Sequence, residues 1–206
     1  MGLFDWLWKP NSTRYVKSIP DSIWLTKSAK FQGVARAALQ NRKYDGVVLL
    51  AHFEETLGLL NTIADKLSSS TNIVAGLVSE LDSESPLRRV LAAAESPLVL
   101  VAERHLLPTE DEQVIASLNE RMRPAHLQFH VSLEDALMQA FAGAWVHGLL
   151  LSLGAKEEEA IQSEMVQRRI HQAQKKLAAR CTSNEPACSG EEWLRLNDPK
   201  WTDPAK

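Results

Sequence analysis

The side chains best suited to acid–base chemistry follow the apolar runs of this sequence. If the runs are parallel strands, their carboxyl ends share one edge of a sheet, where open α/β folds bind ligands. Imidazoles and carboxylates serve at such edges as general acids, general bases and metal ligands. One hypothesis is therefore a hydrolase that uses His52, His105 and Asp135. The polar residues that follow the four runs are His52, then Ser79 and Glu80, then Glu103, Arg104 and His105, and finally Ser132, Glu134 and Asp135.

The same residues have an alternative, purely structural interpretation. They fall on separate loops, and no spacing among them is specific to a catalytic site. Ser132 and Asp135 form the pattern of a helix cap, and Glu103 beside Arg104 is typical of a surface ion pair. We favour this interpretation, so the sequence predicts no catalytic residue.

Motifs for phosphate and metal binding are absent from the sequence. The glycines are scattered and neither GxxxxGK[ST] nor GxGxxG occurs, so autonomous nucleotide hydrolysis is not expected. Cys181 and Cys188, with His171 upstream, lack the close cysteine pairs of structural zinc sites. We therefore expect neither a metal nor a cofactor. Basic residues in 168–180 follow acidic residues 157–159, an order that suits a solvated helix better than an anion site.

The composition of the 206 residues is that of an average globular domain. Lys and Arg number 23 against 26 Asp and Glu, and 45% of the residues are apolar. The formal charge of −3 gives no basic footprint, so nucleic acid is not an expected partner. No apolar run approaches the roughly 20 residues that cross a bilayer. Two cysteines close together favour a reducing compartment, and we expect a cytoplasmic protein.

Residues 1–10, MGLFDWLWKP, form a short amphipathic segment. Leu3, Phe4, Leu7 and Trp8 recur at helical spacing, and an aspartate inside the run argues against a secretory signal. Such a patch would touch a membrane surface or a partner only weakly. The favoured alternative is that the segment folds back onto the domain.

Apolar runs and helix signals alternate through the middle of the chain. Continuous Val, Ile and Leu runs predict strands covered on both faces, and cap residues with apolar stripes predict helices between them. Strand followed by helix, repeated, predicts an α/β fold with a parallel sheet flanked by helices. The predicted strands are 47–51, 73–78, 98–102 and 127–131. Helices are predicted from Asp21 or Ser22, over 54–67, from Pro86, from a capping box of Thr109 and Glu112, over about 133–153 behind Ser132 and Asp135, and over about 157–179.

Several short motifs occur in order in the second half of the chain. These are AERH at 102–105, VSLEDALM at 131–138, and LGAK followed by EAI between 153 and 161. They resemble the TERH, LSMEDALM and LGMKPGEAI of SecA, the preprotein translocase ATPase. Trp24-Leu25-Thr26 is similar to the Tyr-Leu-Thr that opens the family's second motor lobe, and Lys30 to its Lys. The resemblance implies a RecA-like helicase C-terminal lobe with the start of the helical scaffold as a C-terminal helical extension.

The departures from the SecA pattern bear on activity. Where the family has QLRGRSGR, whose arginines reach the ATP phosphates, this chain has QVIASLNE at residues 113–120. Ile115, Ser117 and Glu120 stand in place of the three arginines, and contacts of that kind supply large rate factors. The motif TNMAGRGTD and the first lobe with its P-loop are missing. The resemblance thus implies a lobe that has lost its contribution to ATP hydrolysis.

We therefore expect a non-catalytic SecA-like domain that acts as a binding or regulatory module in protein export. Its partner would be SecA itself or another export component. Two alternatives stay open, which are a residual ATP or ADP site at Glu103-Arg104-His105 and the hydrolase described above. The candidate interaction anchors are Trp6, Trp8, Trp193 and Trp201, since aromatic residues are common at interfaces.

The expected organisation has four parts. Residues 1–20 form the amphipathic segment, 21–155 the degenerate lobe, 156–180 the helical extension and 181–206 a loose tail. The tail is rich in Pro, Asn, Asp and Ser, which is why no element is predicted there.

Overall fold

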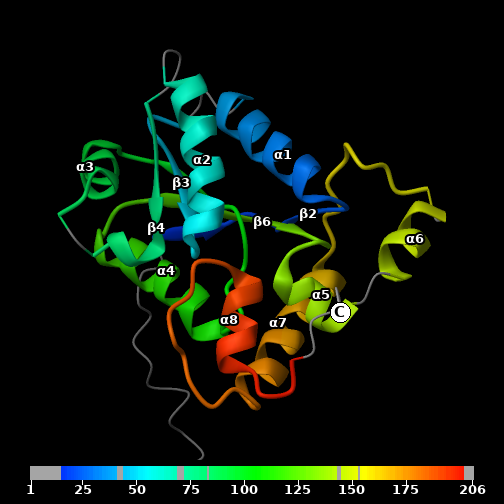
Figure 1. Cartoon of the computed structure of the whole chain (residues 1–206). Helices are drawn as coiled ribbons and strands as arrows, with labels where there is room; N and C mark the ends of the chain where they lie inside the picture. Colours follow the sequence, from blue (N-terminus) through cyan, green and yellow to red (C-terminus); the bar gives the residue numbers. More distant parts are fainter. Residues whose placement is uncertain are drawn as a thin grey trace, which may run out of the picture.

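The described residues form six short strands in a parallel sheet, with helices on both sides (Figure 1). The computed structural model describes residues 15–40, 44–68, 72–82, 84–142, 145–152 and 154–201. The strand order is β1-β6-β5-β3-β4, and β1 and β2 pair in turn with the beginning and the end of β6. The predicted α/β fold is confirmed. The strands are β1 Val16–Ser18, β2 Ser22–Trp24, β3 Val47–Ala51, β4 Ile73–Leu77, β5 Leu98–Val101 and β6 Ala125–Ser132.

Both faces of the central strands β3 and β5 are buried, which explains their continuous apolar runs. Val47 and Leu49 of β3 pack toward helices α1 and α2, whereas Val48 and Leu50 pack toward α3, α4, α7 and α8. The helices are α1 Lys27–Gln40, α2 Glu54–Leu67, α3 Pro86–Ala93, α4 Pro108–Glu120, α5 Ala136–Ala142, α6 Trp145–Ser152, α7 Glu164–Ala178 and α8 Gly190–Asn197, with a 3₁₀ turn at Val78–Glu80. No described helix is long and apolar enough to cross a bilayer.

Local patterns predicted the central elements well. The four predicted strands correspond to β3, β4, β5 and β6, and α2 has the predicted bounds. α3 begins at Pro86 as expected, with the Ser85 hydroxyl accepting a hydrogen bond from the Arg88 backbone N–H at 3.4 Å. These elements depend on apolar spacing and cap residues, which are local properties.

The predicted helix start at Asp21 or Ser22 is wrong. Ser22, Ile23 and Trp24 form β2, are all buried, and pair with the end of β6. Helix α1 begins at Lys27, where the Thr26 hydroxyl accepts a hydrogen bond from the Ala29 N–H at 3.1 Å. Pairing with a distant strand therefore overrode a local helix signal.

Two predicted helix starts differ in their caps. The box of Thr109 and Glu112 is wrong, because α4 begins at Pro108 and takes Leu107 as its N-cap. Asp135 does accept a hydrogen bond from the Ser132 N–H, at 2.7 Å, but the helix begins only at Ala136.

The later helices also differ from prediction. The described part of 133–153 forms two helices, α5 and α6, rather than one. Helix α7 begins at Glu164, seven residues later than predicted, because Ile161 forms an antiparallel bridge with Ile23 of β2.

The prediction of a loose tail also differs from the structure. Within its described part, residues 181–201, helix α8 packs on the core and Trp193 is only 1% exposed. Asn197 fastens the segment, since its Oδ1 accepts from the Ser183 hydroxyl at 2.8 Å and its Nδ2 donates to the Glu185 carbonyl at 3.0 Å. Trp193 is therefore a core residue and not an exposed interaction anchor.

Candidate functional site

The residues that follow the strands meet at the carboxyl edge of the sheet, as predicted. Glu103 follows β5 and is buried. Its Oε1 accepts hydrogen bonds from the N–H groups of His52 and Phe53, at 2.9 and 3.1 Å. Its Oε2 accepts from the Thr56 hydroxyl at 2.8 Å. Burial raises the pKa of Glu103, and the nearby Lys30 cation opposes that rise. Glu103 thus joins the end of β5 to the residues that lead into α2 and to the first turn of that helix.

Arg104 binds two buried aspartates. Its Nη2 lies 2.8 Å from Asp21 Oδ2, and its Nη1 lies 3.2 Å from Asp111 Oδ2. The guanidinium also lies 3.7 Å from the centroid of the Phe129 ring, a cation–π contact. The predicted surface pair of Glu103 and Arg104 is therefore wrong, since each residue pairs with a different part of the chain.

Asp111 of α4 is the centre of this polar cluster. One oxygen lies 3.1 Å from His52 Nε2 and accepts from the His105 N–H at 3.0 Å. The other accepts from Gln174 Nε2 of α7 at 2.7 Å. Burial acts to raise the pKa of Asp111, but the hydrogen bond and charge of His52, with Arg104, lower it overall. A carboxylate only accepts, so the proton in the contact with His52 lies on Nε2.

The two histidine rings of the cluster are 5.1 Å apart. His105 Nδ1 accepts a hydrogen bond from the Leu107 N–H at 3.0 Å. Burial, together with the charge of His52, lowers the pKa of His105 to about 3. His105 is therefore neutral near pH 7, and its ring stacks on Phe53 and meets the edge of Trp193.

Asp135 belongs to a different pair. Its Oδ1 lies 2.6 Å from Lys30 Nζ of α1, and both side chains are buried. The hydrolase hypothesis needs Asp135 beside the histidines, but Lys30 is its ion-pair partner while Asp111 is that of His52. The sequence analysis did not identify Asp21, Asp111 and Gln174 as members of this site, because none of them directly follows a predicted strand. Lys30 was singled out only by the family resemblance.

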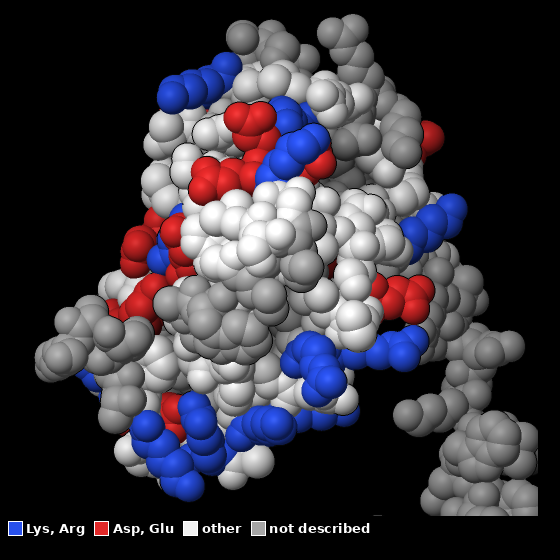
Figure 2. All heavy atoms as spheres, turned by 90° about the vertical axis from the view of Figure 1, so that its right-hand side faces the viewer, with Lys and Arg blue, Asp and Glu red and all other residues white. Residues whose placement is uncertain are grey.

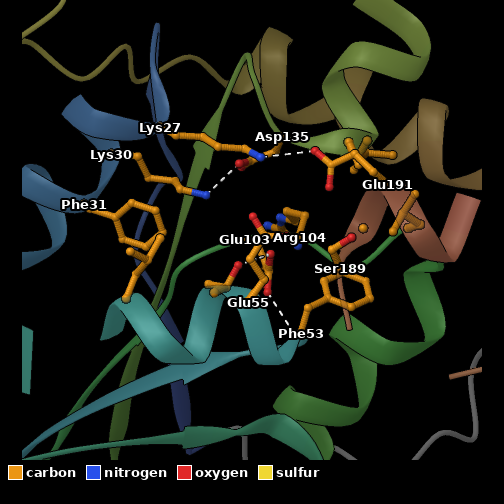
Figure 3. Close-up of a pocket in the computed structure, with 16 residues that line it drawn as sticks. Lys27, Lys30, Phe31, Phe53, Glu55, Glu103, Arg104, Asp135, Ser189 and Glu191 are labelled. Carbon is orange, nitrogen blue, oxygen red and sulfur yellow. Dashed lines mark hydrogen bonds and ion pairs between the residues drawn. The ribbon is translucent and has the colours of Figure 1, made fainter. Parts of the chain in front are cut away.

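The C-terminal segment covers this edge of the sheet (Figure 3). The Glu55 N–H donates to the Cys188 carbonyl at 3.0 Å, and Lys27 forms a 3.1 Å ion pair with Glu191. At Gly190 an added Cβ would lie 2.9 Å from Ala136 Cβ, so only glycine permits so close an approach. The cavity beneath this segment measures about 30 Å³. Its lining includes Lys30, Glu103, Arg104, Asp135, Ser189 and Glu191.

Ile115, Ser117 and Glu120, which the resemblance aligned with three arginines, lie on α4. Ile115 packs against the hydrophobic core. Ser117 and Glu120 line a separate cavity of about 440 Å³ beside α3, together with Arg88, Arg121 and Arg123. Arg121 is held by the Leu91 and Ala94 carbonyls.

The remaining predicted residues are the other tryptophans and the cysteines. Trp6 and Trp8 lie outside the described residues. Trp201 is half-buried and packs against the core. Cys181 and Cys188 are free thiols, and the described residues hold no group of three or more His, Cys, Asp or Glu that is placed to bind a metal.

Comparison with known proteins shows that the chain is similar in sequence to the SecA of several species. The chain is 29% identical to the protein translocase subunit SecA of Nitratidesulfovibrio vulgaris over 185 residues, which are 78% of this chain and 22% of that protein. It is 27% identical to the SecA of Desulfovibrio desulfuricans over 194 residues, or 82% and 23%. A shorter match to the SecA of Acinetobacter baylyi reaches 40% identity over 82 residues, or 40% and 9%. The resemblance to SecA is confirmed.

The matches cover only a part of each SecA protein. The chain spans less than a quarter of the length of these SecA relatives. No family model matches it. Among solved structures, the C-terminal part of the Fun30 ATPase domain aligns with a TM-score of 0.39 and 9% identity, covering 74% of this chain and 54% of that one. A score this low carries no argument about function.

Proposed function

We propose that this chain is a non-catalytic SecA-like domain that acts as a binding or regulatory module in protein export. Its partner in this proposal is SecA or another export component, met in the cytoplasm or at the inner-membrane surface. The relationship to SecA supports the link with export, and the filled strand edge supports the absence of catalysis.

One observation carries the proposal, namely the size of the cavity at the carboxyl edge. Ligand sites in proteins usually measure about 300–1,000 Å³. Here the space is about 30 Å³, enough for a water molecule. Ser189, Gly190 and Glu191 occupy the position over the strand ends where a nucleotide would lie in an open α/β fold.

The chemistry of the remaining residues supports the same proposal. Glu103, Arg104 and His105 each have partners within the chain, so none is left to contact a phosphate. Glu120 stands where a phosphate-contacting arginine would be expected, and its charge has the opposite sign. The hydrolase alternative has less support, because Lys30 pairs with Asp135.

The proposal is tested with the purified full chain. Thermal unfolding is followed with and without Mg-ATP or Mg-ADP, and ATP turnover is measured in parallel. We expect no shift and no turnover, whereas a ligand present at a hundred times its Kd would stabilise the chain by about 2.7 kcal/mol. Binding to purified SecA is then measured by interferometry, where saturable binding is expected. Saturable ATP hydrolysis by the chain would contradict the proposal.

A further inference from the structure

A third cavity, larger than the two described above, lies away from the strand edge. It measures about 660 Å³ and runs between α5 and α7, reaching the start of α6. The part of the chain that lines it is mostly apolar. The lining residues used below are Met138, Phe141, Met165, Arg169, Ala173 and Lys176.

The floor of this groove belongs to the core, but its rim is open. Met138 is buried, Phe141 and Ala173 are half-buried, and Met165 is 69% exposed. A methionine adapts its shape to different apolar surfaces, and contiguous apolar surface of this kind marks interaction sites. The groove is therefore shaped to receive apolar side chains.

The charged residues that line the groove are all basic. Arg169 and Lys176 line it directly, and Arg168 and Lys175 lie on the same helix. The described lining contains no acidic residue. Glu164 at the start of α7 pairs with Arg168, but both side chains are exposed, so this pair offsets little of the helix's charge. Figure 2 shows uncharged surface at the centre of this face with blue side chains along its lower edge.

We propose that this groove binds an amphipathic helix of a partner protein, with an apolar stripe flanked by acidic residues. The inference rests on the proposed function and names the class of partner. A helix presents apolar anchors at i, i+3, i+4 and i+7, which suits a groove between two helices. Acidic flanks would meet Arg169 and Lys176. Residues 1–10 of this chain carry one acid and one base, so they lack the acidic excess.

A partner helix fits the groove better than a lipid surface does. The apolar residues form a concavity walled by α5 and α7, whereas a bilayer needs apolar side chains that project outward. The charge also lies on one wall only, since all four cations belong to α7. A single charged wall sets the orientation of a bound helix.

The test uses two fluorescent synthetic helices of about 18 residues, which span roughly 27 Å. Both carry the same leucine stripe, but one has glutamates on its polar face and the other has lysines. Binding to the full chain is measured by anisotropy. We expect the glutamate peptide to bind at least about tenfold more tightly, with an affinity that falls as salt rises.

Matched variants test whether the glutamate peptide binds in this groove. Met165→Glu and Lys176→Glu are each expected to weaken the glutamate peptide about tenfold. Leu39→Glu and Lys66→Glu are the matched controls, since each puts glutamate in place of an exposed apolar or basic residue on α1 or α2, and they are expected to leave binding unchanged. Met165 is exposed, so its variant is expected to fold, and thermal unfolding checks this.

Three results would overturn the inference. The first is that the two peptides bind equally well or not at all. The second is that Met165→Glu leaves the affinity for the glutamate peptide unchanged. The third is that the chain binds phosphatidylglycerol vesicles in place of the glutamate peptide, with the same dependence on the variants. Because binding to SecA is measured separately, failure here leaves the proposed function intact if SecA still binds elsewhere. Failure of both measurements would remove both proposals.

Discussion

His130 in β6 is a buried imidazole with one hydrogen-bond partner. Its Nδ1 accepts from the Trp24 indole N–H at 3.3 Å, and its Nε2 is buried without a partner among the described residues. Burial, with the nearby Lys30 cation, lowers the pKa of His130 from 6.5 to about 3. The ring is therefore held neutral in the folded state.

This depressed pKa predicts a loss of stability in acid. Between about pH 6.5 and pH 3 only the unfolded chain takes up the proton at this position, so the free energy of unfolding falls as the pH falls. The contribution of His130 is complete above pH 6.5. His105, whose pKa is also lowered to about 3, acts in the same direction. Urea unfolding at several pH values measures the effect.

His130→Gln is the control for this pH dependence. Glutamine keeps an acceptor for the Trp24 N–H but does not titrate, so its unfolding free energy should change less between pH 6.5 and pH 4 than that of the parent chain. An identical pH dependence in the variant would show that His130 does not contribute.

Alanine substitutions at two helix glycines are predicted to have opposite effects on stability. At Gly33 of α1 an added Cβ would lie 2.0 Å from the Trp24 ring, so Gly33→Ala forces a core side chain to move. Such overpacking costs about 1–3 kcal/mol, more than the roughly 1 kcal/mol gained in helix propensity. At Gly58 of α2 an added Cβ meets nothing within 4 Å, so Gly58→Ala should stabilise by about 1 kcal/mol.

Urea unfolding of these two variants compares them directly. Since both changes are glycine to alanine inside a 14-residue helix, the intrinsic helix preference is the same. A stabilised Gly33→Ala variant would mean that the Trp24 ring does not lie against α1.

Elements were predictable where their cause was local. Helix α2 has the predicted bounds because its apolar stripe and acidic first turn are contained in its own residues. β2 was not predictable, because Ile23 and Trp24 follow a helix-like pattern and become a strand only through pairing with β6. Helix α8 was missed because its eight residues sit among turn-forming ones, and packing of Trp193 is what stabilises it.

The candidate site was likewise predictable only where its arrangement follows from the order of strands along the chain. Parallel strands put His52, Glu103 and His105 at one edge, and this followed from the sequence pattern. The partners Asp21 and Gln174 come from distant parts of the chain, and no spacing relates them to the strands. Buried charges need such partners, but which residue provides each one depends on tertiary packing.

Trp193 fastens the C-terminal segment over the sheet. Its indole N–H donates to Asn184 Oδ1 at 2.9 Å, and its ring lies against His105. Trp193→Ala should lower the free energy of unfolding by about 3–5 kcal/mol, measured in urea, and should speed protease cleavage between Cys181 and Ser189. Trp193→Phe, which keeps most of the volume, should lose less.

The Trp193→Ala variant also separates two explanations for the lack of nucleotide binding that we propose. If Ile115, Ser117 and Glu120, in place of the arginines expected from the resemblance, are sufficient to prevent binding, Trp193→Ala still shows no thermal shift with Mg-ATP. A shift that emerges only in this variant would identify the C-terminal segment as a cover over a residual nucleotide site, contrary to the proposed function. Far-UV circular dichroism confirms that the variant retains its helices.

The pairing of β1 and β2 with β6 has a consequence for how the protein is made. Val16 and Ile23 leave the ribosome before their strand partners Ala125 and Val131, which are synthesised more than a hundred residues later. At about 5–20 residues per second, these two strands wait at least several seconds without a partner. The early strands are therefore exposed to misfolding or chaperone binding during synthesis, and β6 ends that interval.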